Sequence, residues 1–266
     1  MILMGVVNLT PDSFREDTRA MTSEAVKARV DALLARGCSI IDFGAVSTRP
    51  GAPDVPLEEE WARLEPALAL IENGGMPLKT VSLRSTPPSG AGPLPLTLPR
   101  VAWVFKGIPP FSIDTTSAEI VRRVYDRVGP FIVNDISAGE DDPEMLQTVA
   151  SLRLPYVAMH KRGNPRSMDS LTEYPEGIVK AVDDYFRSFG KRASSLGIDN
   201  WILDPGFGFA KTIEQNWELL EHVDTLRHFG RPILVGVADK RFTRTREAGY
   251  AERLAEERGA DILRIH

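Results

Sequence analysis

Cysteine is nearly absent from this chain of 266 residues, which contains only Cys38. A single cysteine excludes an intramolecular disulfide and is typical of proteins of the reducing cytosol. Long apolar runs are absent too, since none approaches the roughly 20 residues that span a bilayer. The first residues, Met1 to Gly5, lack the basic stretch and the small-residue cleavage site of a signal peptide. We therefore expect a cytoplasmic protein that does not contact a membrane.

Concentrated positive charge is also missing. The formal net charge is −5, and no block of Lys and Arg interleaves with aromatic residues. Nucleic acid is therefore not an expected partner. What the chain does contain is an ordinary hydrophobic fraction of 42%, which is enough for a sizeable core.

Short apolar runs alternate with segments of helical periodicity along the whole chain. Continuous apolar runs are typical of parallel strands that are buried on both faces. The predicted strands cover residues 2–8, 40–44, 111–115, 131–136, 155–160, 201–206, 232–237 and 260–266. The predicted helices cover residues 23–36, with Ser23 as N-cap, and 57–73, 117–128, 143–152, 175–195, 214–226 and 243–258.

Eight strands that alternate with seven helices predict a (β/α)8 TIM barrel, formed by residues 1–266 as a single α/β domain. A doubly wound sheet is the alternative, but no glycine-rich dinucleotide turn follows the first strand. The helix that normally follows the last strand is missing or truncated. Residues 75–110 are rich in Pro, Gly and Ser and break the rhythm, so we expect an insertion before the third strand, at the face opposite the active site.

Polar residues stand at or just beyond the carboxyl ends of these strands, where TIM barrels place their active sites. Arg264 and His266 lie two apart on a strand, so they face the same side and suit a phosphate or diphosphate. Asp114, Asn134 and Asp204 suit a ligand edge rich in N–H donors, because ionised carboxylates only accept hydrogen bonds. The mixture indicates a small molecule with an anionic end and a donor-rich heterocycle. The whole set comprises Asn8, Asp42, Thr48, Arg49, Asp114, Asn134, Asp135, His160, Asp204, Lys240, Arg264 and His266.

Seven motifs in this order resemble the signature blocks of the dihydropteroate synthase family. They are Met4-Gly-Val-Val-Asn-Leu-Thr-Pro-Asp-Ser-Phe14, Ser47-Thr-Arg-Pro-Gly-Ala52, Ser112-Ile-Asp-Thr115, Asn134-Asp135, Met159-His160, Asp204-Pro-Gly-Phe-Gly-Phe209 and Arg264-Ile-His266. The resemblance implies a pterin-binding TIM barrel of folate biosynthesis. Such a transferase condenses 7,8-dihydropterin-6-ylmethyl diphosphate with 4-aminobenzoate and releases pyrophosphate.

The resemblance also implies a role for each matching residue. Catalysis would depend on Asp114, Lys240 and Asp204. The pterin diphosphate would be bound by Thr48, Asp114, Asn134, Ile136, Met159, Asp204, Phe209, Gly236, Lys240, Arg264 and His266. The 4-aminobenzoate would be bound by Phe14, Thr48, Arg49, Pro50 and Arg241. Asn8 would ligate Mg²⁺, the implied cofactor, which would bridge the diphosphate.

The chain departs from the family's pattern at several positions. The loop that usually reads Ser-Arg-Lys-Ser is here Ala238-Asp-Lys-Arg241, and Val46 stands where the family has Glu. These departures concern the 4-aminobenzoate side more than the pterin side. The stretch between Lys240 and Gly259 is short, and it normally contributes to the family's dimer interface, so a homodimer stays an open question. Two alternatives also stay open: a pterin-binding paralogue with impaired catalysis, and a methyltransferase that uses methyltetrahydrofolate.

Overall fold

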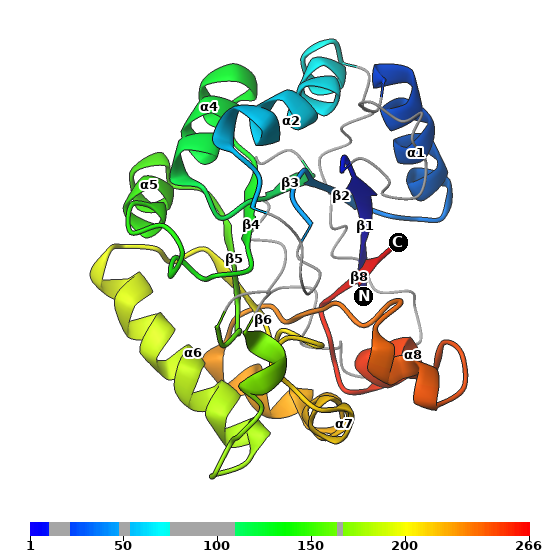
Figure 1. Ribbon diagram of the computed structural model, residues 1–266, viewed down its shortest axis with the longest axis vertical. Coiled ribbons are helices and arrows are strands. Elements are labelled where there is room, and N and C mark those ends of the chain that lie inside the picture. Colours follow the sequence, from blue (N-terminus) through cyan, green and yellow to red (C-terminus); the bar gives the residue numbers. More distant parts are fainter. Residues whose placement is uncertain (11–21, 48–53, 75–109, 164–166) are drawn as a thin grey trace, which may run out of the picture.

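The computed structural model describes residues 1–10, 22–47, 54–74, 110–163 and 167–266. The predicted insertion, residues 75–110, lies outside the described residues except for Pro110. Within them, eight parallel strands form a barrel with helices around it (Figure 1). The predicted (β/α)8 fold is therefore confirmed.

The strands follow one another around the ring in chain order, so each pairs with its neighbours along the sequence, and the first strand lies next to the last. They are β1 (Ile2–Asn8), β2 (Ile40–Gly44), β3 (Phe111–Asp114), β4 (Ile132–Asp135), β5 (Tyr156–Met159), β6 (Trp201–Asp204), β7 (Leu234–Val235) and β8 (Ile262–Ile265). β1 pairs with both β2 and β8. The ring closes between β6 and β7 through one isolated bridge, Leu203 with Ile233.

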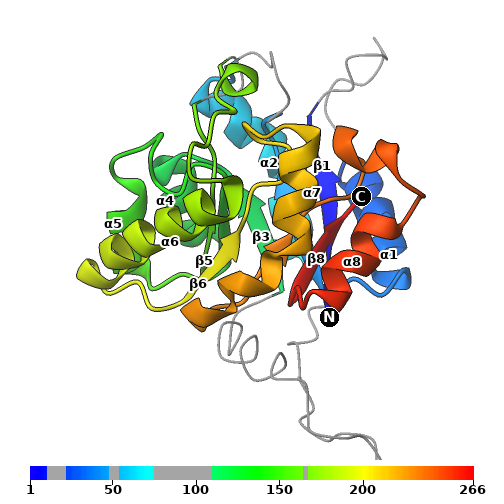
Figure 2. The same cartoon turned by 90° about the horizontal axis from the view of Figure 1, so that it is seen from below.

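Seven α-helices lie on the outside in the described part of the chain. They are α1 (Ser23–Ala35), α2 (Leu57–Glu72), α4 (Ala118–Val128), α5 (Met145–Leu152), α6 (Ile178–Ser195), α7 (Ile213–Glu221) and α8 (Tyr250–Glu257). Three short 3₁₀ helices, η1 (Met168–Ser170), η2 (Val223–Phe229) and η3 (Arg241–Thr245), complete the connections. None of the helices described here is long and apolar enough to cross a membrane. Because β1 and β8 are parallel neighbours, the two termini lie at opposite ends of the barrel (Figure 2).

Two apolar clusters hold this arrangement together. The larger one fills the space between the strands and the surrounding helices, with side chains such as Phe43, Phe186 and Trp217. The smaller one fills the barrel interior and consists of Ile2, Met4, Ile40, Ile132, Val157, Ile202, Leu234 and Ile262. The strands are thus apolar on both faces, which explains why they appear in the sequence as continuous hydrophobic runs.

The structure corrects four details of the predicted elements. Thr22, not Ser23, is the N-cap of the first helix, because its side chain accepts a hydrogen bond from the backbone N–H of Ala25 at 3.3 Å. The predicted helix at 243–258 is split into η3 and α8, since Gly249 adopts a left-handed φ of 75°. The predicted helix at 214–226 ends at Glu221 and continues as η2. β7 is only two residues long.

Candidate active site

The side chains singled out from the sequence form one layer of the barrel interior, above the apolar cluster. Residues two apart on a strand face the same side, and each member stands two positions beyond an interior residue, which in β3 is Ser112. The layer consists of Asp42, Asp114, Asn134, Met159, Asp204, Gly236 and Arg264. Asp114 and Asn134 are partners in register on β3 and β4, so their predicted proximity is confirmed.

Arg264 connects this layer across the barrel. Its Nε donates to Asp42 Oδ2 at 2.8 Å, and its Nη2 donates to Asp114 Oδ2 at 2.8 Å. Asp42 also accepts from Asn134 Nδ2 and from Ser112 Oγ. Four strands are therefore joined by one polar network in which two carboxylates face one guanidinium.

Burial shifts the pKa values of the ionisable groups in this layer. It raises the pKa of Asp114 to about 7, against the opposing effect of the Arg264 charge. It also raises the pKa of Asp204, although the backbone N–H of Gly206 donates to that carboxylate at 2.8 Å. Burial and the charge of Arg264 together lower the pKa of Lys240 to about 8. Such shifts are frequent at functional sites, where charged groups are held out of water.

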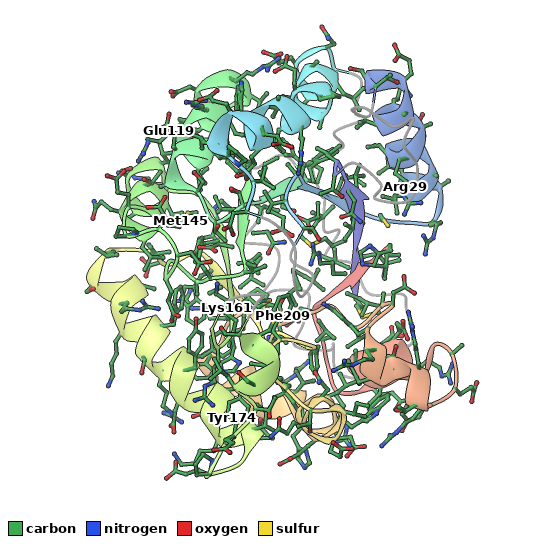
Figure 3. The ribbon with its side chains drawn as sticks, viewed as in Figure 1. Arg29, Glu119, Met145, Lys161, Tyr174 and Phe209 are labelled. Atoms are coloured by element: carbon green, nitrogen blue, oxygen red, sulfur yellow. The ribbon has the colours of Figure 1, made fainter. Side chains whose placement is uncertain are left out.

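A small apolar cluster lies beside these charges. Ile136, Met159 and Phe209 are at most 8% exposed, and they pack with Met168 and Ala210, apart from the two larger clusters. Lys240 Nζ lies 4.8 Å from the centre of the Phe209 ring, within the range of a cation–π contact. Phe209 lies near the middle of the ring of helices, whereas Glu119 and Arg29 lie on outer helices (Figure 3). This cluster provides apolar side chains at the edge of the charged layer.

A buried lysine, Lys211, holds the loop that carries Phe209 through bonds to its backbone. Lys211 Nζ donates to the carbonyl oxygens of Gly206 and Phe209, at 2.8 and 3.0 Å, and lies 3.0 Å from His160 Nδ1. Burial lowers the pKa of Lys211 to about 7. Gly206 has a φ of 70°, and a Cβ there would lie 2.0 Å from the carbonyl oxygen of His160, so only glycine fits.

The other predicted residues are more exposed than these or lie outside the described residues. Phe14, Thr48, Arg49 and Pro50 lie outside the described residues. Asn8 is exposed at the end of β1, and His266 is exposed after β8, where its carbonyl oxygen accepts from Arg36. Arg241 is exposed at the start of η3, directly after Lys240. Gly236 is half-buried, and a Cβ there would lie 3.8 Å from the Cβ of Arg264.

Two residues of this region had no predicted role. Asp42 was recognised only as a polar residue near a strand end, and Lys211 was not recognised at all. The alternation along β2 was the available signal for Asp42, because it places that carboxylate two residues beyond inward-facing Ile40. No comparable signal exists for Lys211, since the sequence does not reveal that a loop lysine is buried.

Comparisons with known proteins agree with this geometry. The family model described as "Pterin binding enzyme" matches residues 4–92 and 89–266. A dihydropteroate synthase of Synechocystis sp. is 33% identical over 278 residues, which cover 99% of this chain and 84% of that protein. The folic acid synthesis protein fol1 of Pneumocystis carinii is 36% identical over 247 residues, covering 91% of this chain but only 29% of that longer protein.

The fold is similar to that of solved structures over its whole length. The dihydropteroate synthase of Xanthomonas albilineans, solved with 4-aminobenzoic acid, superposes with a TM-score of 0.77. It is 32% identical in sequence, and the match covers 100% of this chain and 87% of that one.

Proposed function

This chain belongs to the family of pterin-binding enzymes, and from that premise we propose that it acts as a dihydropteroate synthase. It is a transferase that condenses 7,8-dihydropterin-6-ylmethyl diphosphate with 4-aminobenzoate to give 7,8-dihydropteroate and pyrophosphate. The observation that carries this function is the inward layer of Asp114, Asn134 and Asp204 beside Lys240, on the barrel that those synthases share.

The layer can recognise the pterin by its pattern of donors. Asp204, Asn134 and Asp114 would accept from the amino and ring N–H groups, and Lys240 would donate to the ring carbonyl and nitrogen. A buried polar group that finds no partner costs about 1–3 kcal/mol, so a heterocycle with the wrong edge is rejected. Phe209, Met159 and Ile136 would pack on its face.

The reaction breaks the C–O bond between the pterin methylene and the diphosphate while the amine nitrogen of 4-aminobenzoate bonds to that carbon. Positive charge on the methylene is stabilised by the carboxylates of Asp114 and Asp204 in a site of low polarity. Arg264 and His266 would hold the diphosphate, which leaves as pyrophosphate. An aromatic amine loses its proton readily once it is alkylated, so no dedicated base is required.

Mg²⁺ is the cofactor that we propose for the diphosphate. No cluster of three acidic, histidine or cysteine side chains suited to a metal occurs in the described ranges. Mg²⁺ often keeps several waters and takes only one or two protein ligands besides phosphate, so the exposed amide oxygen of Asn8 fits this mode. When bound, the ion would neutralise charge on the leaving group.

The 4-aminobenzoate side would involve Phe14, Thr48, Arg49 and Pro50, with Arg241 at the rim. The single cysteine, Cys38, supports a cytoplasmic location for the enzyme.

A coupled assay for pyrophosphate tests the function directly. The purified protein should release pyrophosphate from the pterin diphosphate only when 4-aminobenzoate is present. Binding of the pterin without release would instead indicate a catalytically impaired paralogue. Methyl transfer from methyltetrahydrofolate without pyrophosphate release would indicate the methyltransferase.

A further inference from the structure

Asp42 lies beneath the proposed pterin site and bonds to two of the side chains that face it. It is 0% exposed, so it cannot itself contact a ligand in this conformation. Its carboxylate accepts from Arg264 Nε at 2.8 Å, from Asn134 Nδ2 at 3.1 and 3.3 Å, and from Ser112 Oγ at 2.5 Å. We propose that Asp42 is a positioning residue, which fixes Asn134 in the orientation that recognises the pterin and Arg264 in the orientation that would hold the diphosphate.

Asp42 determines which end of the Asn134 amide faces the ligand. An ionised carboxylate has only acceptors, so the group that Asn134 turns toward Asp42 has to be its NH₂. An amide carries its oxygen and its nitrogen on opposite sides of one carbon. Fixing the NH₂ against Asp42 therefore directs the carbonyl oxygen of Asn134 away from it, and a ligand above the layer meets an acceptor.

Asp42 also helps to fix the guanidinium of Arg264. The guanidinium is a rigid planar fork, so two bonds at different nitrogens define its plane. Nε is held by Asp42 and Nη2 by Asp114, both at 2.8 Å. Burial lowers the pKa of Arg264, yet these two carboxylates outweigh that effect and raise it. The cation is thereby held in one orientation with Nη1 outside both bonds.

One carboxylate serves both partners. All the neighbours of Asp42 named above donate, and their four contacts match the roughly four acceptor positions of a carboxylate. Loss of this charge would leave Arg264 with one carboxylate fewer and Asn134 free to rotate its amide. Asp42 thus couples the recognition of the heterocycle by Asn134 to the position of the arginine.

This inference rests on the proposed function, because it takes a pterin as the ligand, and the experiment separates the two. The probe is pteroic acid, titrated by calorimetry into wild-type protein and into Asp42→Asn. The new amide can present its own NH₂ to Asn134, whose amide then turns and offers a donor where the pterin needs an acceptor. We expect the Kd to rise at least about tenfold, as for a buried polar pair left unmatched.

A rescue distinguishes positioning from a general structural effect. In the double variant Asp42→Asn/Asn134→Asp the acid and the amide exchange places, and the net charge is kept. The amide at position 42 now donates to the carboxylate at position 134, and the group that faces the ligand is again an acceptor. We expect the Kd to return to within about fivefold of the wild-type value.

Asp135→Asn is the matched control, because it removes an equally buried carboxylate from the next residue of the chain. Asp135 belongs to the polar set expected from the sequence, but it alternates with inward-facing Asn134 on β4 and therefore faces away from the barrel interior. It accepts from Tyr156 and Ser137 instead of from the pterin-facing side chains. Folded Asp135→Asn should therefore bind pteroic acid within about threefold of wild type.

Wild-type protein that does not bind pteroic acid overturns the proposed function. Wild-type binding with unchanged affinity in Asp42→Asn, or a double variant no better than Asp42→Asn, overturns the role of Asp42. If Asp42→Asn does not fold, a folded double variant with near wild-type affinity supports the role, and one that has lost affinity overturns it. If neither folds, a crystal structure of the wild-type complex decides, because the role requires Asn134 and Arg264 to keep their bonds to Asp42.

Discussion

Asp204, the last residue of β6, illustrates how a single acceptor can select a ligand. Its carboxylate is 6% exposed and already accepts from the backbone N–H of Gly206, so it offers its remaining positions in a site with little water. Asp204→Asn replaces an acceptor oxygen by a donor that would face the donor edge of the pterin. We expect the affinity for the pterin diphosphate to fall at least about tenfold, which equals about 1.4 kcal/mol. Calorimetry measures this, and an unchanged Kd would remove Asp204 from the pterin site.

The charges of Asp114 and Lys240 predict a maximum in the pH dependence of pterin binding. Burial raises the pKa of Asp114 to about 7, so below that pH its carboxylate takes up a proton and loses acceptor capacity. Burial lowers the pKa of Lys240 to about 8, so above that pH the lysine becomes neutral and donates more weakly. Affinity should therefore be greatest between these values and fall on both sides.

Two variants show which group causes each fall in affinity. They also correct for titration of the ligand itself. The fall in affinity toward acid should disappear in Asp114→Asn, and the fall toward alkali should disappear in Lys240→Met. A profile that keeps both limbs in both variants would assign them to other groups.

Arg241 predicts a specificity effect on the second substrate. It is exposed directly after Lys240, at a position where the family usually has a small hydroxyl residue. A guanidinium there could bind the carboxylate of 4-aminobenzoate through a charge-assisted bond. Arg241→Ala should then raise the KM for 4-aminobenzoate and leave the Kd for the pterin diphosphate unchanged, and Arg241→Ser should recover much of the loss. Equal KM values in all three proteins would return Arg241 to the class of solvated surface charges.

At the scale of elements, the β6–α7 loop predicts a link between Lys211 and pterin binding. Lys211→Met keeps the length of the side chain but removes its bonds to the carbonyl oxygens of Gly206 and Phe209. Two buried acceptors lose their partner, so we expect the free energy of unfolding to fall by about 1–3 kcal/mol. Phe209 should also move from its place beside Met159, and affinity for pteroic acid should fall.

Lys161→Met is the control for this effect. Lys161 is also buried, but it pairs with Asp141 at 2.6 Å. Thermal unfolding and calorimetry on both variants check the prediction. A loss of stability in Lys211→Met without a loss of affinity would show that the loop does not need this lysine to position Phe209.

The elements differ in how far the sequence predicted them, and the reasons are physical. Strands such as β1 and β2 have the bounds expected, because an apolar run that ends in Asn8 or Gly44 marks a buried strand directly. The split between η3 and α8 was not predicted, because the charged run around Gly249 carries little apolar periodicity. Helix periodicity cannot reveal a left-handed glycine that restarts the helix.

The candidate site also contains features that the sequence predicted and features that it did not. Asp114, Asn134 and Asp204 were predictable because strand direction alone brings their side chains to one end of the barrel. The link from Asp42 to Arg264 joins residues 222 positions apart, and only closure of the ring between β1 and β8 makes it possible. Periodicity indicates which way a side chain faces, but not which partner it meets across the barrel.

The points where the chain leaves and rejoins the described fold around the Pro-rich stretch predict that this stretch is dispensable for chemistry. The chain leaves the described fold after α2 and returns at Pro110, directly before the amino end of β3. The candidate site lies at the carboxyl ends of the strands, on the opposite side of the barrel. Replacement of residues 78–105 by a short Gly/Ser linker should leave turnover within about threefold, provided that the protein folds. Inactivity of a folded, monodisperse variant would show that this stretch reaches or organises the site.

The barrel has its weakest seam between β6 and β7, where a single isolated bridge closes the ring. Every other pair of neighbouring strands is held by a ladder of at least two register pairs, whereas β6 and β7 are joined only at Leu203 and Ile233. Asp204 lies on the β6 side of this seam, and Lys240, which follows β7, lies on the other side. The distance between the acceptor and the cation that we propose to bind the heterocycle therefore depends on the seam with the fewest backbone bonds. Separating these two strands would break fewer backbone pairings than separating any other pair of neighbouring strands.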